Sequence, residues 1–140
     1  LPPGVEVTRW REEELLVFLP PHHSLAAKGE VKLAELADEP FVMIAAEAAP
    51  AYHTHMHRCC LEAGFRPRIV QEAERAQAVA ALTVAGAGVA ILPASLQRIT
   101  GNGLVLRRAG GTKKMTMTHS VVHLARVSFP VAKLLAALRR

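Results

Sequence analysis

The chain has 140 residues, which suits one domain of ordinary size and is long enough to bury a substantial core. Hydrophobic residues make up 51% and charged residues 21%, a composition that excludes an intrinsically disordered chain. No run of about 18 apolar residues occurs, so we expect no membrane span. The net charge is +5, but Lys and Arg come singly or in pairs without interleaved aromatics. We therefore expect no nucleic-acid-binding face on this chain.

The first residues and the two cysteines bear on where the protein works. The chain opens on Leu1-Pro2-Pro3-Gly4, with no initiator Met and no apolar signal-peptide region, so we expect a segment of a longer protein. Cys59 and Cys60 are adjacent, and neighbouring residues rarely reach disulfide geometry. Two free thiols predict a reducing, cytoplasmic compartment.

Apolar runs and Pro or Gly stops predict the elements of the first half. Val5–Trp10 is expected to be extended and closed by a charged run, and Leu15–Leu19 is typical of a strand covered on both faces. The next expected elements are a turn at residues 22–29, a short helix at Lys32–Ala37, a strand at Phe41–Ala45 and a helix at Pro50–Ala63 that Gly64 ends.

The second half continues the alternation of strand and helix. Its expected elements are strands at Arg68–Glu72 and Val89–Leu92, helices at Arg75–Ala85 and Ala94–Ile99, a turn at residues 101–103, strands at Leu104–Leu106 and Met117–Leu124 around a loop at 109–114, and a helix at Phe129–Leu138. This order predicts an α/β fold with a mostly parallel sheet and helices on both faces.

Ligands of such sheets bind outside the carboxyl ends of the strands. Here those ends are Ala45–Pro50, Ala73–Arg75 and Pro93–Ser95, so we expect these three segments to lie close together along one edge. Arg75 could pair there with a carboxylate ligand, or it could pair instead with Glu72, Glu74 or solvent. The sequence leaves both possibilities open.

Other constellations predict less chemistry. His53 and His57 have the i, i+4 spacing of metal ligands and Cys60 follows at i+7, but a fourth ligand is missing, so we expect no tight zinc site. Ser95 lacks a nucleophile elbow, and the glycines of Ala85–Gly88 follow a helix where a dinucleotide site needs them after a strand. We therefore expect neither an enzyme nor a bound cofactor.

Four segments in this order and spacing resemble the effector-binding region of LysR-type transcriptional regulators. They are Leu16–Pro20 with His23-Ser24-Leu25-Ala26, then Leu33–Val42, Cys60–Pro67 and, as the most specific match, Val84–Ser95. The resemblance spans about residues 5–99, and Val121–Leu138 follows loosely. It is closest to the subgroup that senses aromatic compounds or their ring-opened dicarboxylates, in which a Pro-x-aromatic segment like Pro50-Ala51-Tyr52 faces the effector.

The resemblance implies two α/β lobes around a cleft, as in type 2 periplasmic-binding proteins. Residues 14–123 would form the second lobe, while 1–13 and 124–140 would belong to or return to a first lobe that is absent. The implied effector-binding residues are Ala46, Glu47, Ala49, Pro50, Ala51, Tyr52, Glu74, Arg75 and Pro93.

The resemblance also implies partners. Helix Arg75–Ala85 would lie at the interface of a homodimer or homotetramer. DNA would be bound only through an N-terminal helix-turn-helix outside this chain, and no membrane would be involved. The alternative function is a solute-binding protein of a transport system.

Overall fold

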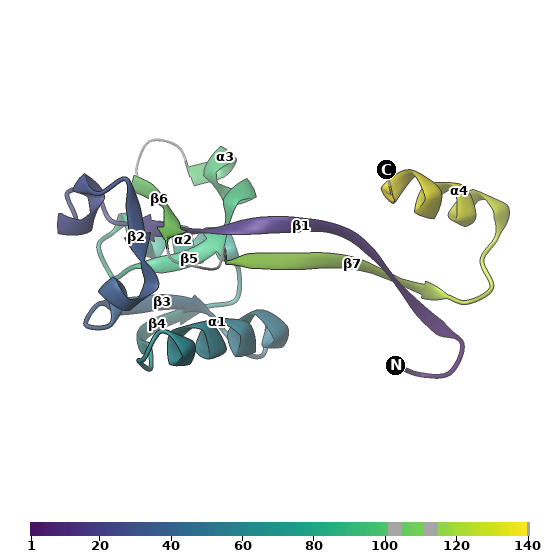
Figure 1. Cartoon of the computed structure of the whole chain (residues 1–140), viewed down its shortest axis with the longest axis horizontal. Helices are drawn as coiled ribbons and strands as arrows, with labels where there is room; N and C mark the ends of the chain where they lie inside the picture. The colour runs from purple at the N-terminus through teal and green to yellow at the C-terminus, as the bar shows by residue number, and fades with distance from the viewer. Residues whose placement is uncertain (101–104, 111–114, 140) are drawn as a thin grey trace. The chain divides into compact units, whose positions relative to one another are not determined.

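Leu15–Leu19 forms the buried half of a long strand, β1 (Val5–Leu19), in the computed structural model, which describes residues 1–100, 105–110 and 115–139 (Figure 1). The expected turn at 101–103, Leu104 and residues 111–114 of the expected loop lie outside the described residues. The charged residues 11–14 do not interrupt β1, because a strand backbone makes its hydrogen bonds whatever side chains it carries.

The chain divides into two compact units. The larger is Glu14–Met115, and the smaller combines Leu1–Glu13 with the chain from Thr116 onward.

The strands of the larger unit belong to two sheets, a parallel pair and a larger sheet of mixed direction. β3 (Pro40–Ile44) pairs in parallel with β4 (Arg68–Ala73), and β2 (Glu30–Lys32) in parallel with β6 (Val105–Gly110). β1, however, pairs antiparallel with both β6 and β5 (Ala90–Pro93), so the expected mostly parallel sheet is not what the structure has. A crossover helix makes only the strands that it joins parallel, and no crossover helix joins β1 directly to either neighbour.

A parallel bridge connects the β3–β4 pair to the segment before β5. Phe41 lies opposite Val89, and the Val42 N–H donates to the Val89 carbonyl at 2.8 Å. The turn before this bridge contains Gly88, where an added Cβ would collide with the Pro40 carbonyl. Gly88 is therefore required for the close approach of the two backbones.

The helices of the larger unit are η1 (Ser24–Ala27), η2 (Leu33–Leu36), α1 (Pro50–Glu62), α2 (Ala76–Val84), η3 (Ala94–Leu96) and α3 (Gln97–Thr100). α1 begins at Pro50 as predicted, and Gly64, with φ +95°, follows its last turn. The expected helix at 32–37 is the single turn η2, preceded by the unpredicted β2.

The core of this unit lies on both sides of its central strands. Phe41 to Ile44 are all buried, and so are Leu15 to Leu19. Because successive strand residues point to opposite faces, β3 and β1 are covered on both faces.

The smaller unit contains the first half of β1, which pairs with β7 (Thr116–Leu124), and α4 (Phe129–Leu138) (Figure 1). Thr8 on β1 is buried, and its hydroxyl lies 2.9 Å from His123 Nε2 and accepts from Arg139 at 3.4 Å. The exposed large apolar side chains of the smaller unit include Val7, Trp10, Val122, Leu124, Phe129, Val131 and Leu134. In the described part of the chain, no helix is both long and apolar enough to cross a membrane.

Candidate functional site

The carboxyl ends of β3 and β4 lie side by side. Ile44 is opposite Ala73 in the parallel register, and the Ala45 N–H donates to the Ala73 carbonyl at 2.9 Å. The bridge between Phe41 and Val89 makes β5 run in the same direction as β3. The segments that leave these three strands therefore start from one edge of the sheet, which is where a ligand of an α/β sheet binds.

The first of these segments turns directly into α1. The N–H groups of Ala48 and Ala49 both donate to the Ala45 carbonyl, at 3.0 and 3.1 Å. Ala49 precedes the helix and offers no side-chain cap, Pro50 occupies the first turn, and no acidic residue lies there. The N-terminus of α1 therefore keeps its free N–H groups and the positive end of its dipole.

The remaining sequence-predicted residues of this segment differ in exposure. Ala46 and Ala49 are half-buried, whereas Glu47, Pro50 and Ala51 are exposed.

Tyr52 lies inside the core, with a 4% exposed side chain. Its hydroxyl donates to the backbone carbonyl of Ile91 in β5. Burial raises the Tyr52 pKa well above its usual range. In this arrangement the ring fixes the first turn of α1 against β5, and its hydroxyl already has a partner.

Arg75 precedes α2 in an extended conformation (φ −124°, ψ 143°) and does not cap the helix with its side chain. Within residues 1–100, 105–110 and 115–139, no carboxylate lies within 4.0 Å of its guanidinium nitrogens. Glu72 instead approaches His53, with 3.9 Å between Oε1 and Nε2. Among the described residues, neither Glu72 nor Glu74 therefore forms an ion pair with Arg75, and pairing with solvent or with a carboxylate ligand both stay open. Glu74 is exposed beside it, and Pro93 is half-buried at the end of β5.

The histidines of α1 form a close pair. The ring centroids of His53 and His57 are 4.5 Å apart, and His57 Nε2 is inaccessible to solvent and has no hydrogen-bond partner. Burial, together with the neighbouring His53, lowers the pKa of His57, and Glu72 partly opposes this. Among the described residues, no group of three or more His, Cys, Asp and Glu could hold a metal ion. The absence of tight zinc binding stays a prediction.

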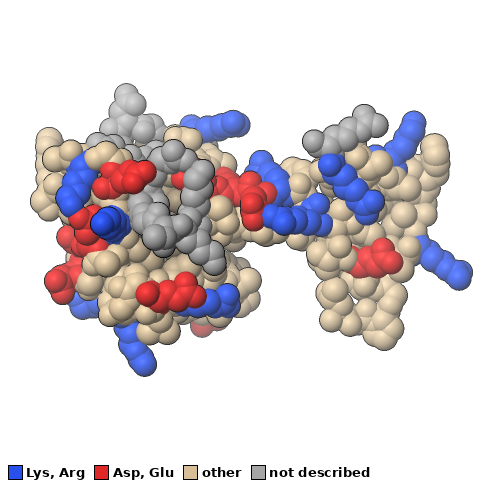
Figure 2. Space-filling view, in the orientation of Figure 1, with Lys and Arg blue, Asp and Glu red and all other residues tan. Residues whose placement is uncertain are grey.

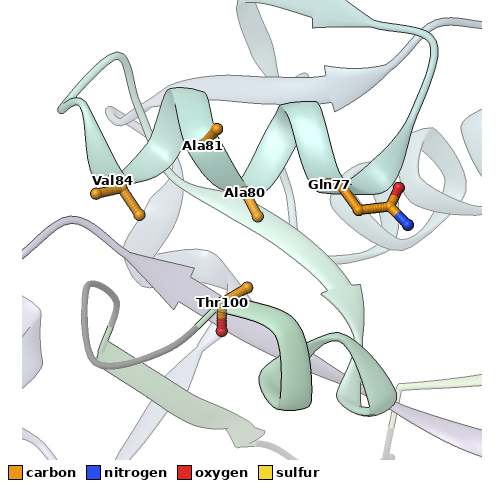
Figure 3. Close-up of a pocket in the computed structure, with 5 residues that line it drawn as sticks. All are labelled: Gln77, Ala80, Ala81, Val84 and Thr100. Carbon is orange, nitrogen blue, oxygen red and sulfur yellow. The ribbon is translucent and has the colours of Figure 1, made fainter.

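Sequence reasoning missed a pocket of about 340 Å³ beside α2. In Figure 3, Gln77, Ala80, Ala81 and Val84 line it from α2, and Thr100 faces them from the end of α3. The sequence contains only part of the signal for this pocket. The consecutive alanines at 80 and 81 leave room beside a helix, but only the placement of α3 encloses the pocket.

Charged side chains are interspersed on the face of the molecule that Figure 2 shows, and no continuous basic stripe crosses it. The absence of a nucleic-acid-binding face stays a prediction.

Comparison with known proteins shows which family this chain resembles. The sequence profile of the LysR substrate binding domain matches residues 1–140. The transcriptional regulator AlsR of Bacillus subtilis (strain 168) is 37% identical over 93 residues, which are 66% of this chain and 31% of AlsR. IlvR of Caulobacter vibrioides is 36% identical over 104 residues, 74% of this chain and 34% of IlvR. The chain thus spans about a third of these relatives.

A solved structure agrees with the sequence matches. The crystal structure of CbnR, a LysR family transcriptional regulator, superposes with a TM-score of 0.85 at 26% identity, covering 100% of this chain and 48% of CbnR. This fold is the periplasmic-binding-protein-like fold that the resemblance implied. Since the family profile matches its full length, this chain belongs to the LysR substrate-binding domain family.

Proposed function

We propose that this chain senses a small anionic metabolite for a bacterial LysR-type transcriptional regulator and binds it at the carboxyl ends of β3, β4 and β5. The observation that carries the proposal is the combination, at one sheet edge, of two helix N-termini without side-chain caps and of Arg75, which has no carboxylate partner among the described residues.

These groups favour an anion for a simple electrostatic reason. The start of α1 and the start of α2 each present free N–H groups and the positive end of a helix dipole, with no acidic residue in either first turn. Arg75 adds a full positive charge and a planar set of donors that matches a carboxylate. Glu47 and Glu74, both exposed, would accept hydrogen bonds from ligand hydroxyl groups.

The effector class that fits this site is an aromatic acid or a dicarboxylate. An apolar wall is available from the first turn of α1, and the donors suit one or two carboxylates. The structural neighbours BenM and QuiR were solved with benzoate and shikimate, at 24% and 19% identity, where the likeness concerns the fold. Both ligands are carboxylates and serve as first probes.

The proposed mechanism is a population shift. An effector that contacts both lobes favours one angle between them, and the shift reaches attached DNA-binding domains. CbnR, 25% identical to this chain, was solved in full length with its target DNA. For this protein we place DNA binding in a helix-turn-helix outside the chain and the regulator in the cytoplasm.

The exposed apolar side chains of the smaller unit favour the proposal that a first lobe outside this chain covers them. Phe129 is 75% exposed, Leu124 66% and Leu134 57%, which is more than isolated surface positions explain. We propose that the first lobe covers α4 and β7 here, so residues 1–13 and the C-terminal segment belong to that lobe.

The outer face of α2 supports self-assembly. Ala81, Val84 and Ala85 are exposed along one stripe, and the pocket beside Ala80 can accept a side chain from a neighbouring subunit. We propose that helix 75–85 lies at the interface of a homodimer or homotetramer.

The relatives support neither of the two other functions, a transport protein and an enzyme. AlsR and IlvR are regulators, which gives no support to a solute-binding protein of a transport system. Homologous regulators are generally not enzymes, and we propose no covalent chemistry.

The test is binding of benzoate, shikimate and adipate to the protein that carries this chain at its full encoded length, by calorimetry and thermal shift. A carboxylate at about 100 times its dissociation constant adds roughly 2.7 kcal/mol of stability. Arg75→Ala should weaken its binding by about 1.5–3 kcal/mol, the range for a hydrogen bond to a charged group.

Arg66→Ala is the matched control, because Arg66 is exposed and precedes β4 at the other end of that strand. This variant should bind as the wild type does. Equal loss in both variants, or no response to any of the three carboxylates, contradicts the proposal.

A further inference from the structure

His53 and His57 stand in α1 directly behind the helix N-terminus to which we assign the effector. His53 is the fourth residue of α1, and its N–H donates to the Ala49 carbonyl at 3.0 Å. Its ring packs on the ring of His57 one turn later, with 4.5 Å between the centroids. A positive charge on this pair therefore lies within about 10 Å of an anion bound at the start of the helix.

The surroundings of the pair contain one opposing charge. The carboxylate of Glu72, on β4, is 3.9 Å from His53 Nε2. The other strands that pack against α1 contribute nothing that titrates, because β3 and β5 contain only apolar residues and proline. On α1 itself, the buried thiol of Cys60 has its pKa raised to about 12 by burial, so it stays neutral. Glu72 is thus a charged group that acts on both imidazoles.

The two tilted imidazole rings lie beside one carboxylate, that of Glu72. Burial and His53 oppose a positive charge on His57, and Glu72 favours it. His57 Nε2 also lacks a hydrogen-bond partner among the described residues.

We propose that the His53–His57 pair makes anion binding at the start of α1 dependent on pH, so that protonation of the pair strengthens binding of a carboxylate effector. The inference rests on the proposed function and deepens it. The added charge attracts the anion directly.

The experiment measures benzoate affinity between pH 5.5 and 8 on the protein that carries this chain at its full encoded length. Benzoate keeps its charge over this range, because carboxyl groups titrate near pH 4. Affinity should rise about two- to fifteenfold toward pH 5.5, the range that Coulomb attraction over about 10 Å gives between the dielectric of water and that of a protein surface. The His53→Gln/His57→Gln variant should lose this dependence.

His55→Gln is the control, because it removes an imidazole from the same helix outside the pair. A flat wild-type profile, or a slope that persists in the double variant, overturns the inference. If the double variant does not fold, the histidine ring signals of the wild type decide by NMR: saturating benzoate must shift the titration midpoint of the pair upward, by the reciprocity of linked binding. An unchanged midpoint overturns the inference.

The two proposals fail in different ways. Benzoate binding that is lost in Arg75→Ala but constant across pH leaves the proposed function intact and contradicts the role of the histidines. If neither benzoate, shikimate nor adipate binds at any pH, both proposals fail.

Discussion

The side chain of Tyr52 joins α1 to β5: its hydroxyl donates a hydrogen bond to the backbone carbonyl of Ile91, and its ring is buried between them. The contact is important for the candidate site because Pro50 and Ala51, which begin the same helical turn, are exposed at the sheet edge. A rigid first turn presents its free N–H groups in a defined direction.

Tyr52→Phe removes this hydrogen bond without changing the packing of the ring. We expect a loss of about 1–2 kcal/mol in the free energy of unfolding, because a buried carbonyl loses a partner. Urea unfolding monitored by circular dichroism measures it. An unchanged midpoint would show that the bond contributes nothing to stability.

Gly88→Ala should destabilise the larger unit by about 1–3 kcal/mol, the usual cost of an overpacked position. The new Cβ would collide with the backbone carbonyl of Pro40, and backbone cannot move aside as a side chain does. Gly29→Ala is the matched control, since nothing lies within 4 Å of the Cβ added there. Thermal unfolding of both variants checks the difference; equal midpoints would contradict the close approach.

The two adjacent thiols should react at different rates. Cys60 is fully buried and its pKa is raised to about 12, first by burial and then by Cys59, whereas Cys59 is half-buried. Because the thiolate is the reactive form, a thiol reagent should label Cys59 in the folded protein and Cys60 only after unfolding. Cys59→Ser should abolish native labelling and Cys60→Ser should keep it. The reverse pattern would be incompatible with the structure.

Acid should weaken the fold through His57. Its pKa in the folded state is lowered from 6.5, first by burial, so below pH about 6.5 the unfolded chain binds the proton more readily. Stability should therefore fall as the pH drops from 6.5 toward the folded pKa, with no contribution from this group above that window. His57→Gln should flatten this part of the profile in urea unfolding at pH 5–8. A variant as acid-sensitive as the wild type would assign the effect to other groups.

Local signals in the sequence determined the boundaries of several elements. Pro50 and Gly64 delimit α1, the apolar run Leu15–Leu19 forms a buried strand, and α4 spans Phe129–Leu138 as predicted. These predictions succeed because backbone restrictions, missing donors and apolar periodicity act over a few neighbouring residues.

The tertiary structure alone decided how these elements meet. The antiparallel pairing of β1 with β5, the hydrogen bond from Tyr52 to Ile91 and the approach of Glu72 to His53 all join residues that are distant in the sequence. The sequence placed Arg75 at the correct strand end, but whether its charge is neutralised depends on distances of a few ångströms between side chains. Such distances depend on the packing of whole elements, which no local pattern encodes.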